Sequence, residues 1–179
     1  MVAVIAIRAA VSADAEQLAE LRWEFRIARA PATEDHDAFV RRCAEWMRRE
    51  LDSQAVWRAW VAAAGETVVG QVWVQTIHKM PNPVAEGERH AYVSNVFVQP
   101  AYRGGAGSRL LEAAVAWARA SNIDRVILWP SARSVTLYER HGFTHHGDVM
   151  ELALGPRRRS SAESPDRSPP APPDLAAKA

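Results

Sequence analysis

The sequence predicts a single α/β domain whose mixed, mostly antiparallel sheet is flanked by helices. Three observations lead to this fold class. Over residues 1–154, β-rich runs alternate with runs whose apolar residues recur at helical spacing. Two of the β-rich runs are separated only by Gly65 and Glu66, which is typical of a hairpin. A glycine-rich turn after a further β-rich run then leads into a helical one.

Each expected element has its own signal. The first helix begins near Ser12, a residue that caps helix N-termini well, and Pro31 stops it. Pro100 closes a strand, and Gly142 ends a short helix. We expect strands at residues 2–8, 56–63, 67–77, 91–98, 125–129 and 143–154, the last as one strand or a pair, and helices at about 12–28, 33–51, 108–120 and 134–141.

The composition changes at Gly155. Residues 155–179 contain six prolines, several serines and three consecutive arginines, but only one large aliphatic residue, Leu175. Such a segment buries too little apolar surface to offset its ordering entropy. We therefore expect a domain at residues 1–154 and a disordered tail at residues 155–179.

Charge and cysteine content narrow the function classes. The chain has 22 Lys and Arg against 21 Asp and Glu, a formal net charge of +1, so no strong field attracts nucleic acid. Its single cysteine, Cys43, forms no internal disulfide and suits a reducing compartment. The apolar run at residues 2–7 is too short for a signal peptide or a membrane span. We expect a cytoplasmic protein without nucleic-acid or membrane partners.

The chemically informative stretch is residues 96–111, Val-Phe-Val-Gln-Pro-Ala-Tyr-Arg-Gly-Gly-Ala-Gly-Ser-Arg-Leu-Leu. A strand, a turn with three glycines and a helix start let the backbone approach a phosphate and point unpaired N–H groups at it. A Walker P-loop needs Lys before the Ser/Thr, and a dinucleotide fingerprint needs glycine where Leu110 stands. A glycine-rich turn without a ligand remains the third alternative.

This turn and the later Leu137-Tyr138-Glu139-Arg140-His141-Gly142-Phe143 resemble the GCN5-related N-acetyltransferase (GNAT) superfamily. In that family an Arg/Gln-Gly-x-Gly-x-Gly/Ala turn opens a helix, and a Leu-Tyr-x-x-x-Gly-Phe segment precedes the last strands. The turn here is one residue shorter. The resemblance is strongest over residues 90–154 and implies a GNAT-like acyl-CoA N-acyltransferase fold.

The resemblance also implies acetyl-CoA as the co-substrate. Its diphosphate would lie on main-chain N–H groups of the glycine-rich turn, its pantetheine arm would pair with the strand before that turn, and a hydroxyl would replace the family's usual Asn at position 131. The implied cofactor-binding residues are Val96, Phe97, Val98, Arg103, Gly104, Gly105, Ala106, Gly107, Ser108 and Ser131.

Tyr138 is the expected catalytic residue. A phenol can protonate the departing CoA thiolate, since the ordinary pKa values of a tyrosine and a thiol are ~10 and ~8.5. The resemblance thus implies direct transfer of acetyl to a primary amine, and Cys43, which we expect in a buried helical stripe, is not assigned as an acyl carrier. The acceptor is expected to be a small molecule framed by the first two helices and residues 79–89. The sequence leaves open whether the protein forms a homodimer.

The general base is not assigned. Family members often carry Glu at the position of Ser94. The remaining candidates are Glu24, Asp35, His36, His78, Glu88 and His90. Acids such as Glu34 could attract a cationic amine, although acids near a helix start more often stabilise the helix. No metal site is expected from His141, His145 and His146.

Two other functions remain in view. A shorter turn and the missing strand Glu would suit an acyl-CoA-binding module with little or no transferase activity. A nicotinamide-dependent oxidoreductase ranks third, because the dinucleotide fingerprint is only partial. Protection of the fold by CoA or by NAD(H) separates these two alternatives.

Overall fold

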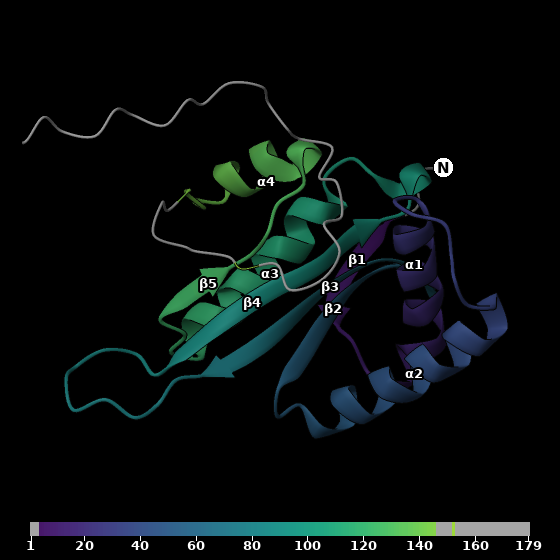
Figure 1. Cartoon of the computed structure of the whole chain (residues 1–179). Helices are drawn as coiled ribbons and strands as arrows, with labels where there is room; N and C mark the ends of the chain where they lie inside the picture. The colour runs from purple at the N-terminus through teal and green to yellow at the C-terminus, as the bar shows by residue number, and fades with distance from the viewer. Residues whose placement is uncertain (1–3, 146–151, 153–179) are drawn as a thin grey trace, which may run out of the picture. The chain divides into compact units, whose positions relative to one another are not determined.

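The structure, a computed structural model of the whole chain, describes residues 4–145 and Leu152. The elements below all belong to one compact unit that ends at Phe143. Figure 1 shows a five-stranded sheet with the order β1-β2-β3-β4-β5. The strands are β1 (Ile5–Ala9), β2 (Trp57–Ala64), β3 (Thr67–His78), β4 (Arg89–Val98) and β5 (Arg125–Ile127). All neighbours are antiparallel except β4 and β5, which are parallel.

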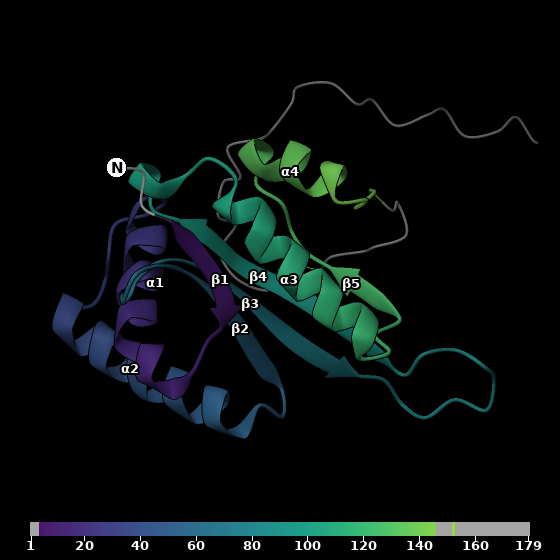
Figure 2. The same cartoon turned by 180° about the vertical axis from the view of Figure 1, so that it is seen from behind.

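Helices cover both faces of this sheet. The first two, α1 (Ala15–Ile27) and α2 (His36–Ser53), lie on one face, and α3 (Ala106–Ala120) lies on the other, as the view from behind shows (Figure 2). A short fourth helix, α4 (Val135–Arg140), follows β5. The predicted mixed, mostly antiparallel α/β fold is therefore confirmed.

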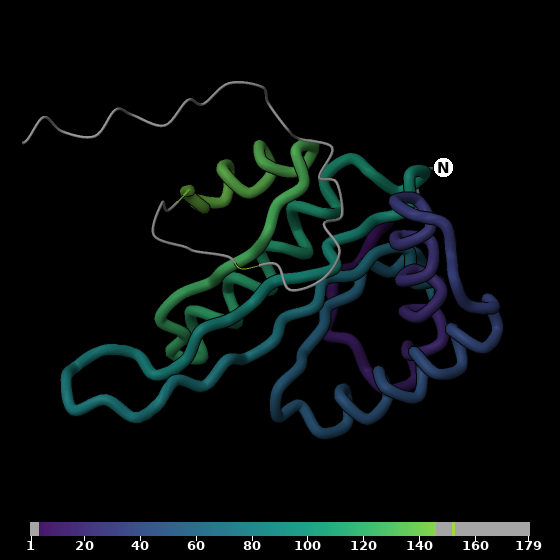
Figure 3. The backbone as a smooth tube through the Cα atoms, in the orientation of Figure 1, coloured from purple at the N-terminus to yellow at the C-terminus, as the bar shows by residue number. Residues whose placement is uncertain are grey.

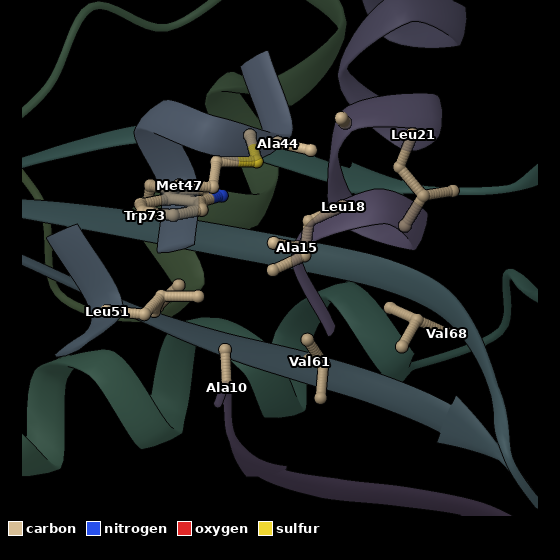
Figure 4. Packing of buried hydrophobic residues seen from close by; sticks show 12 residues of the cluster. Ala10, Ala15, Leu18, Leu21, Ala44, Met47, Leu51, Val61, Val68 and Trp73 are labelled. Atoms are coloured by element: carbon tan, nitrogen blue, oxygen red, sulfur yellow. The ribbon is translucent and has the colours of Figure 1, made fainter. Parts of the chain in front are cut away.

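The central strand β3 explains why two layers of helices are needed. Every residue from Val68 to Val74 is buried, so both faces of the strand must be covered. On the α1 and α2 side, Trp73 packs with Leu18 and Met47, shown in Figure 4. On the α3 side, Val69, Val72 and Val74 of β3 belong to a second cluster with residues of α3, among them Leu110, Leu111 and Ala114. Two apolar clusters thus fix the sheet from opposite sides.

The start of α1 differs from the sequence expectation. A short 3-10 turn, Ser12–Asp14, precedes the helix. The side chain of Asp14 rather than that of Ser12 accepts a backbone N–H at this point. Its carboxylate accepts a 2.9 Å hydrogen bond from the N–H of Val11 and two 2.7 Å bonds from the guanidinium of Arg8. Asp14 is only 5% exposed, so a charged partner from β1 is what allows its burial.

Other boundaries shift by a few residues. The helix α3 begins at Ala106, two residues before the expected start, because Gly105 adopts the left-handed φ of 110° that ends the turn. The strand β5 is shorter than residues 125–129. The closing strand expected at residues 143–154 and the tail at 155–179 lie outside the described residues, apart from Phe143–His145 and Leu152.

The connection from β3 to β4 runs far from the first two helices. Figure 3 shows this segment, residues 79–88, as a loop that extends past the sheet on the side away from α1 and α2. Lys79 anchors it, with its ammonium 3.4 Å from Glu86 and 3.5 Å from Asp124. The loop is therefore attached to the β5 end of the sheet.

Candidate active site

The strand β4 has two halves with different neighbours. Its first half, His90–Tyr92, pairs with β5, Arg125–Ile127. From Val93 onward, no strand within the described part of the chain pairs with β4 on that side. The chain after β5 leads away from β4 toward α4 (Figure 1). The divergence leaves backbone hydrogen-bonding groups of the second half of β4 available to an extended ligand.

A β-bulge lies in this second half. Between the pairs Trp73 with Ser94 and Gln71 with Phe97, β4 uses one residue more than β3. Asn95 adopts a left-handed φ of 54°, which suits asparagine better than most residues. Its side-chain oxygen accepts a 2.9 Å hydrogen bond from the guanidinium of Arg22 on α1. The bulge re-aims the strand where it faces the first helix.

A cavity of about 840 Å³ opens beside the bulge, a size that suits a small-molecule ligand. It is lined by α1, α2, the middle strands and the segment leading into α4. The described residues of its wall include Val93 to Val96 of β4, eight aromatic rings and five arginines. The rings are Phe25, Phe39, Trp46, Trp57, Trp73, Tyr92, Trp129 and Tyr138.

Tyr138 lies in the wall on the α4 side. Its side chain is 9% exposed, and its ring packs edge-on against Phe143 at 5.7 Å. Burial raises the pKa of the phenol, an effect that a hydrogen bond to Ser134 and the charge of Arg29 partly offset. The hydroxyl is thus held protonated at neutral pH, the state a general acid requires.

Serines before α4 hold the wall next to Tyr138. The Ser134 hydroxyl donates to the carbonyl of Ser131 at 2.9 Å and accepts from the Ser131 N–H at 2.9 Å. The two hydroxyl oxygens are also 2.9 Å apart. This reciprocal bonding shapes the turn, and the Ser131 side chain is engaged inside the protein rather than directed freely into the cavity.

The glycine-rich turn lies outside the cavity wall. Gly104 and Gly105 both have a φ of 110°, and nothing lies within 4 Å of a Cβ built on either. The guanidinium of Arg103 folds back, with Nε donating to the carbonyl of Val98 at 3.3 Å. Open space above left-handed glycines at a helix start fits a phosphate cradle.

The first turn of α3 completes this cradle. Its early N–H groups have no partner within the helix, and the helix dipole favours a negative charge there. The Ser108 hydroxyl lies 2.8 Å from Nε2 of His141, whose side chain is 13% exposed. Sequence reasoning missed this histidine as a neighbour of the turn. The signal was present, since His141 follows the Tyr138 helix directly.

The structure places the predicted residues in two groups. Val96, Ser131 and Tyr138 line the cavity, whereas the turn from Arg103 to Ser108 lies outside its described wall. Two strand residues do not line it either. Phe97 packs its ring 5.5 Å from that of Phe25, and Val98 is buried beside Gly70 and Gly107. The residues expected along β4 therefore divide between the cavity and the core.

None of the candidate bases lines the cavity. Glu24 accepts a hydrogen bond from Gln99, Asp35 caps α2 through the N–H of Ala38, and His36 lies between Glu20 and Asp37. Glu88 bonds the N–H of Asn82 in the β3–β4 loop, and His90 faces Asp124. His78 ends β3. Among the described lining residues there is no histidine, aspartate or glutamate.

Cys43 faces the cavity from α2. It is half-buried, and burial raises the pKa of its thiol. A thiol with a raised pKa is a poor nucleophile at neutral pH, because the thiolate is the reactive form. The expected acceptor frame is met in part: the first two helices line the cavity, whereas residues 79–89 contribute nothing to its described wall.

Three features define an acyltransferase fold. Strand β5 pairs in parallel with the start of β4 and the chain then leaves it, a phosphate cradle lies at the start of α3, and a cavity lies beside the β4 bulge. A sequence profile described as the acetyltransferase (GNAT) family matches residues 15–143, and the chain belongs to this family. Acyl transfer is therefore the activity class of the domain. No protein of curated function matches the sequence.

Solved structures show the same fold. A predicted acetyltransferase with acetyl-CoA from Clostridium acetobutylicum aligns with a TM-score of 0.72 at 21% identity, over 84% of this chain and 97% of that one. An acetyltransferase from Trypanosoma brucei aligns with a TM-score of 0.62 at 24% identity, over 84% and 100%. Glucosamine-6-phosphate N-acetyltransferase from Arabidopsis thaliana aligns with a TM-score of 0.63 at 18% identity, over 85% and 99%.

In residues 4–145, no three His, Cys, Asp or Glu side chains are grouped so that they could hold a metal ion. His146, one of the three histidines considered in the sequence, lies outside the described residues. No helix of the described chain has the length and apolar character needed to cross a membrane.

Proposed function

We propose that this protein transfers an acetyl group from acetyl-CoA to a primary amine of a small molecule. The observation that carries the proposal is the second half of β4. It borders the cavity at Val93 to Val96, lacks a strand partner on the β5 side in the described chain, and shares that cavity with Tyr138. A pantetheine arm fits there as an additional strand. Family membership supports the acyl-transfer class.

Two parts of the site bind different parts of acetyl-CoA. The N–H groups from Arg103 to Ser108 bind the diphosphate, and the main chain near Val96 pairs with the arm and donates to the thioester carbonyl. Donors of this kind contribute ~3 kcal/mol each in acyl transfer. When bound, acetyl-CoA supplies the activated acyl carbon to the cavity. Ser131 supports this region through its turn with Ser134.

The reaction then needs one attack and one protonation. The nitrogen of a neutral amine bonds to the acyl carbon while the carbon–sulfur bond breaks, and Tyr138 gives its phenolic proton to the departing sulfur. The proton lost by the new amide nitrogen returns to Tyr138 through water. No covalent enzyme intermediate is needed, which agrees with the raised pKa of Cys43.

Thermal melts and a thiol-release assay test this function. Acetyl-CoA at 100 times its dissociation constant should stabilise the fold by ~2.7 kcal/mol, whereas NAD(H) should not. Amines should then release CoA thiol, and Tyr138→Phe should lower that rate by about 100-fold without changing acetyl-CoA affinity. Binding without release on any amine would favour the acyl-CoA-binding module, and no binding would refute both.

We propose a cytoplasmic location, because a single cysteine suits a reducing compartment. Residues 155–179 are proposed to have no part in catalysis. Removing them after residue 154 should leave acetyl-CoA affinity and turnover unchanged. A loss of either would assign the tail a role in the site.

A further inference from the structure

The charged side chains in the described part of the cavity wall are all positive. Its described residues include the five arginines Arg22, Arg26, Arg29, Arg42 and Arg49, and no acidic residue, lysine or histidine. The whole chain has nearly equal numbers of acidic and basic residues. The positive charge is therefore a property of this cavity and not of the protein as a whole.

Most of these arginines have no acidic partner in the described chain. Arg42 is neutralised, because its guanidinium makes two bonds to Glu34, at 2.6 and 3.1 Å. Arg22 bonds only the neutral Asn95, and Arg29 stacks over the ring of Phe25 at 4.1 Å. Arg26 has no side-chain hydrogen bond or ion pair within residues 4–145. Arg49 on α2 likewise has no side-chain hydrogen bond or ion pair in the described chain, and three guanidinium groups on α1 share one region without a counter-charge.

The spacing along α1 places these three arginines together. Positions 22, 26 and 29 are separated by four and three residues, which puts them on one helical face. Burial lowers the pKa of Arg22 and of Arg29, and the charge of Arg26 lowers both further. Clustered, partly buried cations are costly unless an anion compensates them.

Part of the cavity wall is aromatic. The rings of Trp46, Trp57 and Trp73 lie 5.4 to 6.3 Å apart and close the wall between α2 and the sheet. Such a surface binds an apolar or aromatic body. The cavity therefore offers guanidinium groups for an oxyanion and aromatic surface for an apolar group, with Tyr138 in the same wall.

We propose that the acceptor is an anionic amine: a molecule with an apolar or aromatic body that carries a carboxylate or phosphate, bound by the guanidinium groups of Arg22, Arg26 and Arg29. A planar guanidinium fork matches both oxyanions. This inference rests on the proposed function and gives its acceptor a chemical class. It also reverses the idea that Glu34 and its neighbours attract a cationic amine, because Glu34 is already paired.

The phosphates of the co-substrate do not account for this cluster. The cradle at Gly104 to Ser108, with Arg103 at its rim, contributes no residue to the described cavity wall. Two positive regions are thus present, one at the start of α3 and one on α1. Substitution of Arg26 or Arg29, neither of which bonds the β4 bulge, should affect the acceptor and leave the affinity for acetyl-CoA unchanged.

Matched ligand pairs test the acceptor class by binding alone. N-acetyl-L-phenylalanine and N-acetylphenethylamine differ only in the carboxylate, and calorimetric titration with CoA present should show the acid binding at least about tenfold more tightly. In turnover, phenylalanine against phenethylamine, tryptophan against tryptamine, and phosphoethanolamine against ethanolamine compare each anionic amine with its neutral-bodied counterpart. The third pair tests a phosphate, without an apolar body, against the carboxylate of the first two pairs.

Charge variants identify the residues. Arg26→Gln, which breaks no hydrogen bond in the described structure, should lower the affinity for N-acetyl-L-phenylalanine about tenfold and that for N-acetylphenethylamine less than twofold. Arg26→Lys should recover part of the loss. Arg22→Gln should act in the same way if its melt shows a folded protein. Arg119→Gln, an exposed position in the last turn of α3, is the matched control and should change nothing.

The outcomes separate this inference from the proposed function. Tight binding of the acids without turnover would support the anionic site and refute the transferase. Turnover that prefers phenethylamine, tryptamine and ethanolamine would refute the anionic site alone. Equal binding of N-acetyl-L-phenylalanine and N-acetylphenethylamine, or an Arg26→Gln variant that weakens acetyl-CoA instead, would overturn the proposal.

Discussion

Arg22 on α1 donates a 2.9 Å hydrogen bond to the side-chain oxygen of Asn95, the left-handed residue of the β4 bulge. This one bond links the helix that carries the cationic cluster to the strand proposed to hold the acyl arm. The partner is a neutral amide, so the charge of Arg22 remains available to a ligand. Binding of the acceptor and positioning of the strand are therefore coupled through a single side chain.

Substitutions at Asn95 should separate backbone strain from the lost bond. Alanine at a φ of 54° costs about 1 kcal/mol in conformation, whereas glycine adopts it freely. Both variants lose the bond to Arg22. Urea unfolding should therefore show Asn95→Ala less stable than Asn95→Gly by about that amount, while the two lower turnover similarly. Equal stabilities would mean that the bulge relaxes in the alanine variant.

The glycine-rich turn gives a matched pair of alanine substitutions. Gly105 has a φ of 110°, so Gly105→Ala strains the turn and should weaken acetyl-CoA binding by at least about tenfold, the loss expected for one displaced charge-assisted bond. Gly107 lies within α3, and its added Cβ would meet only Val98 at 3.9 Å. Gly107→Ala should keep the affinity and raise stability by about 0.5 kcal/mol. Calorimetric titration with acetyl-CoA checks both, and equal affinities in the two variants would contradict the cradle.

On the acid side, the pH dependence of kcat/KM should reflect the pKa of the acceptor amine rather than that of a group on the protein. No histidine or carboxylate lines the described cavity, so no protein base titrates near neutral pH there. Log kcat/KM should rise with a slope of one toward the pKa of the acceptor amine, ~10 for an alkylamine. Amines of lower pKa should move the inflection down by the same amount. An inflection fixed near pH 6 to 7 for all amines would reveal a base on the protein.

Tyr138 should set the alkaline side. A general acid works in its protonated form, so activity is present below the phenol's pKa and lost above it. Burial raises that pKa, which moves the loss to higher pH than for a free tyrosine. Turnover should stay high to at least about pH 10, and Tyr138→Phe should remove the alkaline decline along with most of the rate. A decline unchanged in Tyr138→Phe would exclude this role.

The pair of Arg8 and Asp14 should contribute to acid stability. Burial alone would raise the pKa of Asp14, but the hydrogen bonds from Arg8 and from the N–H of Val11 outweigh it, and the pKa falls below its ordinary value. The contribution is therefore present above the pKa of an unfolded aspartate and lost as pH falls through the lower folded value. Asp14→Asn should cost about 2 kcal/mol at pH 7. The urea midpoints of the two proteins should converge as the pH falls through that lower folded value. A constant difference across pH would contradict an ionic origin.

The sequence predicted most of the fold because local signals and burial agreed. Gly65 with Glu66 indicated the β2–β3 hairpin, and the apolar spacing in α3 matched its buried face. The prediction for the start of α1 was wrong, because a 3-10 turn precedes the helix and because Asp14, which accepts the N–H of Val11 in that turn, also takes the guanidinium of Arg8 on β1 as a partner. A capping rule that uses only neighbouring residues cannot include that contact.

The site was predictable only where it consists of local backbone. Residues 103–108 indicate their turn through glycine content, and Tyr138 is found through a resemblance in sequence. The sequence analysis did not predict the cluster of arginines in the cavity wall, although Arg22, Arg26 and Arg29 lie at helical spacing in the sequence. Arginines on a helix usually face water, and only packing shows which face is turned toward a cavity.

The order of strands and helices, the left-handed glycine turn and the phenol at position 138 thus follow from the chain itself, since each depends on residues close in sequence. The bulge at Asn95, its bond to Arg22 and the charge of the cavity were decided by tertiary structure. These features join residues about seventy positions apart in the chain. Their energies depend on burial and distance, and neither exists before the sheet and its helices have packed.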